Sequence, residues 1–572
     1  MLALATRALL GAAALSAALL QGWPARGSPG RGITPADSVH VVRDLQSAQR
    51  SFESFRRMRL PVRERSWGPC EIHIGRYCYW RGDDEDDPMP EEPLSIRARR
   101  IALIRALDSA AAILDGDPWI AGQLVRYLVE AGRIDDAIRF SRERCQAGIA
   151  WCAALGGYAA HMGNRFADAD SAYRIALSEL PAAERCRWLD ISDLIEGDLA
   201  KRFHSLDCDG RDSLARRILL LGAPLYSVSR TDLFTEQLAR FTRIRMAEHS
   251  ESTDGESWGD DVRELMLRYG WPRWYSRSEP PAGSQMEASI TGHDSGMPFD
   301  FMPSLHAVDS IAHLGPGDWN LDDPRALTGY APSFARSVHD LPSQIAVFRR
   351  GDSALVVAAW DARRDTTLLG RELQAALVVA SPSGELTVAR DSGAKTVGRL
   401  WTEAPLDSGI VSLELLAPAE RRAARARVGL PPRDTGRIVL SDLLLYTPTP
   451  AGTTLEAVRD SALATSDVSG ARGVGVYWET YGPRAPEPMH FTLAVEQFGV
   501  GWLRRTAERL HLADPTSGLR LQWDEVPQPV GGMAARAVKL DLSRLRPGHY
   551  RISLTARART GAATTIREIQ VR

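Results

Sequence analysis

Residues 257–272 read SWGDDVRELMLRYGWP, and the chain changes its periodicity at this stretch. Upstream, apolar residues recur at three- and four-residue steps, which is typical of helices; downstream, they alternate or form short runs between turns, which is typical of strands. Within the stretch the apolar residues fall at i, i+3, i+4 and i+7, so they predict a short helix with one apolar stripe: Val262, Leu265, Met266 and Tyr269.

Charged and helix-ending residues mark both ends of this predicted helix. Asp260 and Asp261 stand at its start, where carboxylates are favoured by the unpaired backbone amides and by the helix dipole. Gly270 and Pro272 are placed to end it. An aspartate that acted as a catalytic base would need a His, a Cys or a metal-ligand partner, and the stretch contains none. The acids are therefore interpreted as helix-capping groups.

The tryptophans that flank this helix, Trp258 and Trp271, are expected to bury large areas against neighbouring elements, which favours a structural seam between the two halves of the chain. Together with the rest of 225–276, the stretch resembles the GWxTD domain, a module of exported bacterial proteins, although Ser257 and Asp260 depart from the Gly-Trp-x-Thr-Asp signature. The matching positions are Trp258, Asp261, Arg263, Tyr269, Gly270 and Pro272. The resemblance implies export and a β-rich C-terminal region, and it supplies no enzymatic activity.

Residues 93–224 predict an array of helical hairpins. The segment 151–181, WCAALGGYAAHMGNRFADADSAYRIALSELP, combines small residues that let two helices approach closely with aromatic residues that fill the gap between them. It resembles a tetratricopeptide repeat at these positions: Gly157, Ala160, Phe166, Ala169, Tyr173, Ala176 and Pro181. The segment 117–145 matches less closely, so the resemblance implies a short array rather than a long superhelix.

Beyond residue 276 the sequence predicts a connector and two antiparallel β-sandwiches. Residues 277–340 are rich in Gly, Pro and Asp and show little periodicity. Short apolar runs follow at 341–450, and a second, immunoglobulin-like set at 470–572 includes Tyr550, which is placed to hydrogen-bond across a corner. The expected fold class is multidomain α + β: an N-terminal tetratricopeptide-like helical-hairpin array, a GWxTD-like helical module and C-terminal antiparallel β-sandwiches.

The N-terminal residues indicate export. Residues 1–25 place one Arg ahead of a run of Leu and Ala that is too short to span a bilayer comfortably, which predicts a signal peptide, and 26–92 predict an irregular region with an acidic linker. No later stretch approaches about 18 uninterrupted apolar residues, so no transmembrane span is expected in the mature chain. The net charge of −2 gives no general attraction to nucleic acid. We expect a periplasmic or extracellular protein.

The six cysteines lie in close pairs along the sequence, all between residues 70 and 208. An even number of cysteines in an exported chain favours disulfides, and local pairing is the simplest of many connectivities. Free buried thiols and a metal site stay open as alternatives, although no CxxC spacing is present. The expected partners are Cys70 with Cys78, Cys145 with Cys152, and Cys186 with Cys208.

The sequence contains no complete motif for catalysis, metal binding or cofactor binding, such as GxxxxGKS/T, HExxH or a dinucleotide fingerprint. No cofactor and no metal is therefore expected. We favour a non-enzymatic scaffold that docks other envelope or secreted proteins, because helical arrays and sandwiches both present docking surfaces. An envelope hydrolase or carbohydrate-processing enzyme is an alternative and would use the connector residues His293, Asp294, Asp300 and His306. A glycan-binding module is another and would use exposed sandwich tryptophans: Trp360, Trp401, Trp478 and Trp523.

Overall fold

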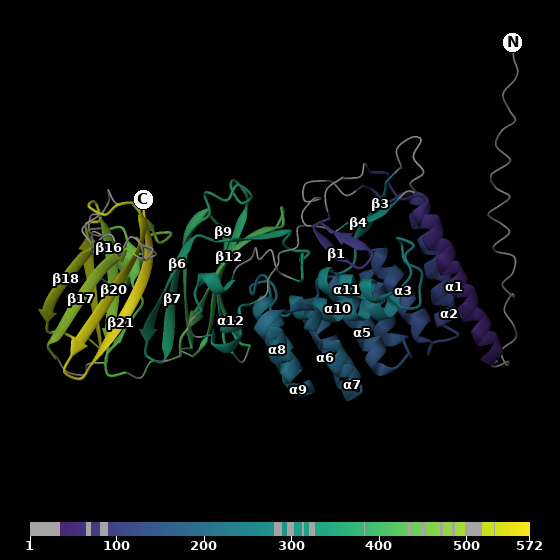
Figure 1. Ribbon diagram of the computed structural model, residues 1–572, viewed down its shortest axis with the longest axis horizontal. Helices are drawn as coiled ribbons and strands as arrows, with labels where there is room; N and C mark the ends of the chain where they lie inside the picture. The colour runs from purple at the N-terminus through teal and green to yellow at the C-terminus, as the bar shows by residue number, and fades with distance from the viewer. Residues whose placement is uncertain are drawn as a thin grey trace, which may run out of the picture.

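Five layers follow one another along the long axis of the molecule: a helical body, the two sheets of a first β-sandwich and the two sheets of a second (Figure 1). The structure is a computed structural model. It describes residues 35–63, 70–80, 90–278, 289–293, 303–311, 314–319, 327–382, 384–405, 407–432, 434, 436–448, 454–469, 473–482, 487–497, 518–530 and 532–572. Within these ranges, none of the helices has the length and apolar character that crossing a bilayer requires. The signal peptide expected at 1–25 lies outside the described residues.

The helical body begins with a long helix and continues through helical hairpins to a central helix. Its helices are α1 (Pro35–Arg57), α2 (Leu94–Ala111), α3 (Pro118–Glu130), α4 (Ile134–Glu143), α5 (Ile149–Met162), α6 (Phe166–Glu179), α7 (Ala182–Trp188), α8 (Gly197–Ser205), α9 (Cys208–Gly222), α10 (Asp232–Ala247) and α11 (Asp260–Tyr269), with a 3-10 turn η1 (Ser192–Leu194). The helix predicted from the apolar stripe is present as α11. Gly270 ends it with φ of +80°, a conformation that favours glycine.

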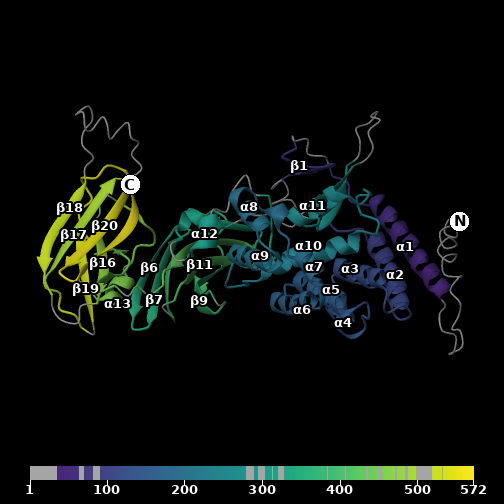
Figure 2. The same ribbon diagram turned by 60° about the horizontal axis from the view of Figure 1, so that its bottom comes forward.

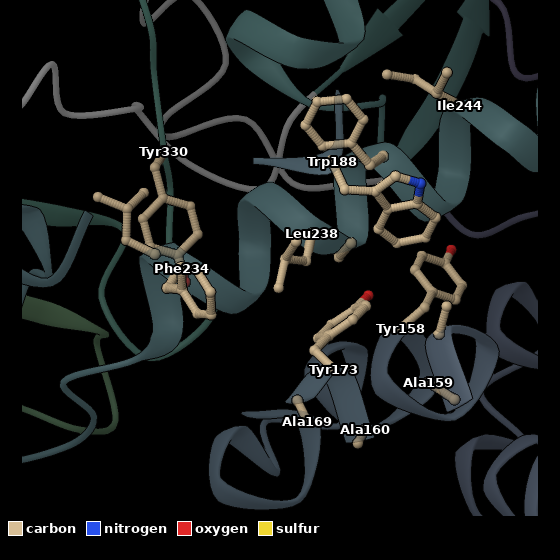
Figure 3. Packing of buried hydrophobic residues seen from close by; sticks show 14 of the residues in the cluster. Tyr158, Ala159, Ala160, Ala169, Tyr173, Trp188, Phe234, Leu238, Ile244 and Tyr330 are labelled. Atoms are coloured by element: carbon tan, nitrogen blue, oxygen red, sulfur yellow. The ribbon is translucent and has the colours of Figure 1, made fainter. Parts of the chain in front are cut away.

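Small residues allow α5 and α6 to pack closely as a hairpin. A Cβ atom at Gly157 would lie 2.9 Å from the ring of Tyr173, so a larger residue does not fit there without displacing the ring. Ala160 and Ala169 are buried in the same region, and Figure 3 shows Tyr173 projecting from this hairpin into the core beside Leu238 of α10. The hairpin is thus one wall of the core that surrounds α10.

The central helix α10 is the axis of the helical body, since 14 of its 16 residues are buried. Because buried polar groups require partners, its polar side chains bond to the helices around it. His161 of α5 contacts the Thr235 hydroxyl at 2.9 Å and the Glu236 carboxylate at 2.7 Å. Gln123 of α3 donates to the Met246 carbonyl at 2.7 Å. These contacts fix α10 within the hairpins.

Two small ribbons and a connector lie beside the helical body. The ribbons pair β1 (Ile72–Ile74) with β2 (Tyr77–Tyr79) and β3 (Trp274–Arg277) with β4 (Ile290–His293). The region 277–340, expected to be an extended connector, also contains α12 (Leu305–Asp309), a 3-10 turn η3 (Pro316–Trp319) and β5 (Ser337–Asp340). Because β5 pairs with β12, the first sandwich begins inside this region.

The first sandwich contains a five-stranded and a three-stranded sheet. In the order of pairing, the five-stranded sheet is β5, β12 (Arg422–Leu430), β11 (Gly409–Ala417), β8 (Leu373–Ala380) and β9 (Leu386–Ala394). The three-stranded sheet is β10 (Val397–Pro405), β7 (Ser353–Asp361) and β6 (Ser343–Arg350). The antiparallel strands predicted from the alternating and short apolar runs are therefore present.

The second sandwich repeats this two-sheet architecture. One sheet comprises β13 (Val439–Leu440), β16 (Val474–Tyr481), β14 (Leu444–Tyr446) and β19 (Met533–Leu540), with α13 (Leu455–Arg459) beside it. The other, in pairing order, is β15 (Asp467–Val468), β21 (Gly561–Val571), β20 (Gly548–Ala558), β17 (Met489–Gln497) and β18 (Leu519–Glu525). The hydroxyl of Tyr550 donates to the Arg546 carbonyl at 2.9 Å, the corner hydrogen bond that the sequence predicted.

The strands of the two sandwiches differ in burial. β7 is buried without interruption from Ala354 to Trp360, and β8 from Ala375 to Ala380. In contrast, β20 alternates between buried and more exposed positions over most of its length, and β21 is buried only at Ile569 and Val571. Continuous burial means that both faces of a strand are covered, whereas alternation means that one face is open. The first sandwich is therefore covered on both outer faces at its inner strands, whereas β9 and β10 are largely half-buried or exposed.

Candidate functional site: the joints on either side of the first sandwich

The helical joint is the contact between the helical body and the five-stranded sheet of the first sandwich. Small apolar residues on the outer face of this sheet belong to the same buried cluster as the helical core: Ala376, Val378, Ala380, Ile410 and Ala423. Separation of the two bodies would expose this cluster to water, which opposes movement at the joint. The helical joint is therefore a continuous core and not a linker.

A buried carboxylate in the helical joint holds the loop that follows α9. Glu414 of β11 is 1% exposed and accepts hydrogen bonds from the backbone amides of Tyr226 at 2.8 Å and Ser227 at 2.9 Å. The Ser412 hydroxyl donates to the same carboxylate at 2.6 Å. A shift of the loop would leave both amides unpaired and remove two of the hydrogen bonds to the buried carboxylate, which is costly. Glu414 thus fixes the loop on the sheet.

Two arginines of β12 bind the end of α9 in the same joint. Arg427 donates to the Leu221 carbonyl at 3.0 Å, and Arg425 donates to the carbonyls of Ala223 at 2.9 Å and Pro224 at 2.7 Å. A helix C-terminus carries unpaired carbonyls and a partial negative charge, so cations are favoured there. Burial, with the neighbouring charge of Arg427, lowers the pKa of the Arg425 guanidinium. The two side chains cap a helix of one body from a strand of the other.

The sandwich joint is the contact between the two sandwiches. The outer faces of β6 and β7 meet β14, β16 and α13 in one buried apolar cluster: Ala346, Phe348, Leu355, Val357, Leu444, Tyr446, Leu455, Val458, Ala462 and Tyr477. Ala535 and Ala537 of β19 pack against the same cluster. Like the helical joint, the sandwich joint is an apolar core shared by two bodies.

A second buried carboxylate lies at the edge of this apolar cluster. Glu479 of β16 is fully buried and accepts two hydrogen bonds from Arg350 of β6, at 2.7 and 2.9 Å. The hydroxyls of Tyr477 and Tyr481 also donate to it. The hydrogen bond to Glu479 raises the pKa of Arg350. The bidentate ion pair orients β6 against β16, because its two parallel bonds require one geometry.

Side chains of each sandwich also form hydrogen bonds with backbone groups of the other. Gln344 of β6 donates to the Leu445 carbonyl at 2.8 Å and accepts from the Leu445 amide at 3.1 Å. Arg567 of β21 donates to the Ile345 carbonyl at 2.7 Å. The Val347 amide donates to Asp442 at 2.9 Å. The sandwich joint therefore combines an apolar centre with paired polar groups around it.

Among the motif residues predicted from the sequence, Asp261 receives the tip of the β1–β2 ribbon. Its carboxylate accepts from the Arg76 side chain at 2.7 and 2.9 Å and from the Arg76 backbone amide at 3.2 Å. These bonds hold the pKa of Asp261 well below its usual range. A Cβ atom at Gly75, whose φ is +54°, would overlap Asp261, so the ribbon tip needs glycine. Asp261 therefore has a structural role, which is to bind the tip of the ribbon.

The remaining motif residues also make structural contacts. Tyr269 stacks on Tyr79 with ring centroids 4.0 Å apart, and Arg263 pairs with Asp193 at 3.3 Å. Pro272 packs so closely on Gly292 that a Cβ atom there would overlap it. Trp258 and Trp271 both pack against the helical core cluster. The stretch therefore forms a structural contact, but this contact joins the helical body to the two ribbons. The contact between the helical body and the first sandwich is made by the helical joint instead.

The tetratricopeptide-like residues lie on the α5–α6 hairpin and directly after it. Phe166, Ala169, Tyr173 and Ala176 are buried on α6, and Pro181 stands between α6 and α7. The docking surface expected on the inner side of these hairpins is occupied, since α10 packs against α3, α5 and α6. The sequence interpretation did not foresee that a helix of the same chain fills this surface, because the polar residues of α10 are typical of an exposed helix.

The cysteines pair as the sequence predicted. Disulfides join Cys70 to Cys78, Cys145 to Cys152 and Cys186 to Cys208, with Cα–Cα distances of 5.6, 5.8 and 5.6 Å. The first closes the ribbon whose tip binds Asp261. Among the described residues no group of three or more His, Cys, Asp or Glu side chains gathers at metal-binding distance.

Of the connector residues suggested for an enzyme, the structure describes His293 and His306, and these two make separate contacts. His293 is buried, stacks on Trp274 at 3.8 Å and contacts the Ser276 hydroxyl at 2.7 Å. His306 contacts Asp318 at 3.2 Å instead. Ser276 and His293 have the spacing of a nucleophile and base, but Ser276 is 3% exposed, so its hydroxyl serves packing within the β3–β4 ribbon. Asp294 and Asp300 lie outside the described residues.

The sandwich tryptophans do not form the platform that glycan binding would use. Trp360 and Trp478 are fully buried. Trp523 stacks on Phe491 with ring centroids 5.2 Å apart, and Trp401, although 43% exposed, lies under the Arg459 guanidinium at 3.8 Å. The four rings are distributed over cores and a joint, and they do not form the exposed coplanar surface that the glycan-binding alternative requires.

The residues that form the two joints were missed by sequence reasoning. A signal was present, since Glu414 and Glu479 each interrupt an apolar strand, in IVSLELLAP and VGVYWETYG. A charge within a strand that is buried on both faces requires a buried partner. The partners Arg427 and Arg350 lie on other strands, 13 and 129 positions away, and spacing along the chain does not identify them.

Comparison with known proteins adds likeness of fold only. No family model matches the chain. No curated protein matches it. Among solved structures, the FN1–FN3 domains of chicken CNTN1 align at 9% identity over 41% of this chain and 67% of that chain, with a TM-score of 0.15. A segment of two fibronectin type-III domains from chicken tenascin aligns at 10% identity over 40% and 99%, with a TM-score of 0.13. A tandem repeat from the extending region of a large adhesion protein aligns at 14% identity over 40% and 49%, also with a TM-score of 0.13.

Proposed function

We propose that this protein is an exported, non-enzymatic scaffold that holds a helical body and a terminal β-sandwich at a fixed separation for docking to other envelope or secreted proteins. The observation that carries the proposal is the burial of both outer faces of the first sandwich. A domain whose inner strands are packed between two neighbours is suited to setting the geometry of those neighbours.

The chemistry of the joints supports a rigid spacer. Each joint combines a shared apolar core with a buried carboxylate, Glu414 or Glu479, that is hydrogen-bonded across the contact. Interdomain contacts within a chain are usually small and polar and permit movement unless they are large and apolar. The three disulfides support export, because such bonds persist in oxidising compartments.

Chemical cross-linking in the exported fraction tests the proposal. A tagged full-length chain is cross-linked in place, and its neighbours are identified by mass spectrometry. We expect reproducible protein neighbours, with cross-links to both the helical body and the second sandwich. Recovery of no neighbour, together with turnover of an ester, peptide or glycoside panel by the purified chain, would overturn the proposal.

A matched pair of variants tests whether fixed geometry matters. Glu414→Ala breaks the helical joint without changing an exposed residue, and Glu403→Ala changes an exposed carboxylate of β10 as the control. We expect small-angle scattering to report one elongated conformation for the wild type and the control, and a broader set for Glu414→Ala. Neighbours that contact both ends of the chain should be lost only from Glu414→Ala.

A further inference from the structure

The terminal strand of the last sheet presents a long, regular edge. β18 pairs with β17 in an unshifted register from Leu519 to Glu525, and within the described part of the chain it pairs with no other strand. In both views β18 lies at the end of the molecule that is farthest from the helical body (Figures 1 and 2). A second molecule could therefore approach this edge without meeting the helical body.

Other sheet edges of the molecule show the features that prevent edge-to-edge pairing. Proteins protect edges by shortness, irregular register, Pro, charged side chains and especially Lys, or by covering them. β15 has two residues and β5 has four. β9 has a register shift against β8 and lies beside β10. β18 has seven residues, LRLQWDE, and its sequence contains no Pro, Gly or Lys.

The sequence of β18 is complementary to itself. In an antiparallel pair of two β18 strands centred on Gln522, the numbers of two facing residues add up to 1044. Arg520 of each copy therefore faces Asp524 of the other, which gives two such pairs. Gln522 faces itself, Leu521 faces Trp523 and Leu519 faces Glu525. Within its own sheet Asp524 also contacts His490 of β17 at 2.9 Å. Even-numbered side chains lie on the exposed outer face and odd-numbered ones toward the core, so like faces meet across the two-fold axis.

We propose that β18 pairs with β18 of a second copy of this chain, joining two terminal sheets into one continuous sheet. The partner is chosen by the edge hydrogen bonds together with the two Arg520–Asp524 pairs, since opposite charges across neighbouring strands stabilise pairing. The result is a two-fold symmetric rod with a helical body at each end. This goes beyond the scaffold function proposed above and does not depend on its partners.

Analytical sedimentation of variants with reversed charges tests the pairing. We expect the wild type to dimerise with a dissociation constant on the order of micromolar, because the contact is small. Arg520→Asp places like charges opposite each other twice and should weaken dimerisation about tenfold or more. Combining Arg520→Asp with Asp524→Arg restores opposite charges and should restore most of the dimer. Arg557→Asp, on the interior strand β20, is the matched control and should dimerise like the wild type.

A site-specific cross-link tests the register. Gln522→Cys places two thiols opposite each other at the two-fold axis, so mild oxidation should give a covalent dimer in high yield. Thr555→Cys on β20 should give little. A wild type that stays monomeric at about 100 μM overturns the proposal. So does a dimer that Arg520→Asp leaves unchanged, or equal cross-linking at the two cysteine positions.

Discussion

The two sandwiches share an architecture and differ in what covers them. In the first, β7 and β8 are buried on both faces, because the helical body covers one sheet and the second sandwich covers the other. In the second, one sheet is covered and the sheet of β17, β18, β20 and β21 presents an outer face with exposed residues. The same fold therefore serves as an internal spacer in one place and as a terminal surface in another.

In the covered sandwich, we expect substitution of Glu414 to cause the largest loss in the free energy of unfolding. Glu414→Ala removes the acceptor of two buried amides and leaves Arg427 without its nearby carboxylate. Removal of one partner from a buried charged network costs about 3–5 kcal/mol. Urea denaturation should show a loss of this size in the free energy of unfolding, and Glu403→Ala should show almost none. A loss no larger than that of the control would contradict a structural role for the helical joint.

A substitution in the sandwich joint should lower the free energy of unfolding by less, and it should uncouple the unfolding of the two sandwiches. Glu479→Gln keeps the size of the side chain and removes the charge that pairs with Arg350, which is partly exposed. We expect a loss of about 2–3 kcal/mol, since hydrogen bonds to charged groups contribute about this much. Calorimetry should resolve a separate transition for the second sandwich. Glu496→Gln, an exposed carboxylate of β17, is the control; a single unchanged transition in Glu479→Gln would show that the sandwiches are coupled by the apolar cluster alone.

A pH series tests whether the helical body and the first sandwich unfold as one unit. Asp232 of α10 is fully buried, and burial raises the pKa of its carboxyl to about 8, while the Tyr330 hydroxyl donates to it at 3.3 Å. The folded state then binds a proton that the unfolded chain, with a pKa of about 3.9, has released. Stability therefore falls as pH rises from about 4 to about 8, by up to about 1.4 kcal/mol per pH unit.

Asp232→Asn removes this titration. Between pH 6 and pH 8 we expect the free energy of unfolding of the variant to change less than that of the wild type, by about 2 kcal/mol. The exposed Asp209→Asn is the control. If the helical joint makes one cooperative unit, the unfolding of the first sandwich should follow the same pH dependence. If the two transitions respond independently to pH, the helical body and the first sandwich do not unfold as one cooperative unit.

The sequence predicts the type of most regions and few of the contacts between them. The prediction of an irregular region at 26–92 is wrong, since it contains the helix α1 and the β1–β2 ribbon. Periodicity identified α11 and the strands, and the close spacing of the cysteines gave their pairing, because these features depend on neighbours along the chain. The pairing of Glu479 with Arg350 and the filling of the hairpin surface by α10 depend on residues far apart in sequence. Apolar runs such as ALVVAAW in β7 do indicate burial on both faces, but they do not identify what covers them.

The smallest expected effect is on the exposed outer face of the terminal sheet. Ser553→Val changes a half-buried position there, and its effect on the free energy of unfolding should stay within about 0.5 kcal/mol. In the covered sandwich, Val378→Thr places a hydroxyl in the helical joint and should cost about 1–3 kcal/mol, because a buried hydroxyl without a partner is unfavourable. Urea denaturation of both variants under one condition measures the difference directly. Both substitutions exchange valine with a hydroxyl-bearing side chain on an outer face, and neither changes a charge. Threonine is β-branched like valine, so β-propensity alone predicts a small effect for Val378→Thr. A large difference between them therefore reports what covers each face, and equal small effects would mean that the outer face of the first sandwich is as open as that of the second.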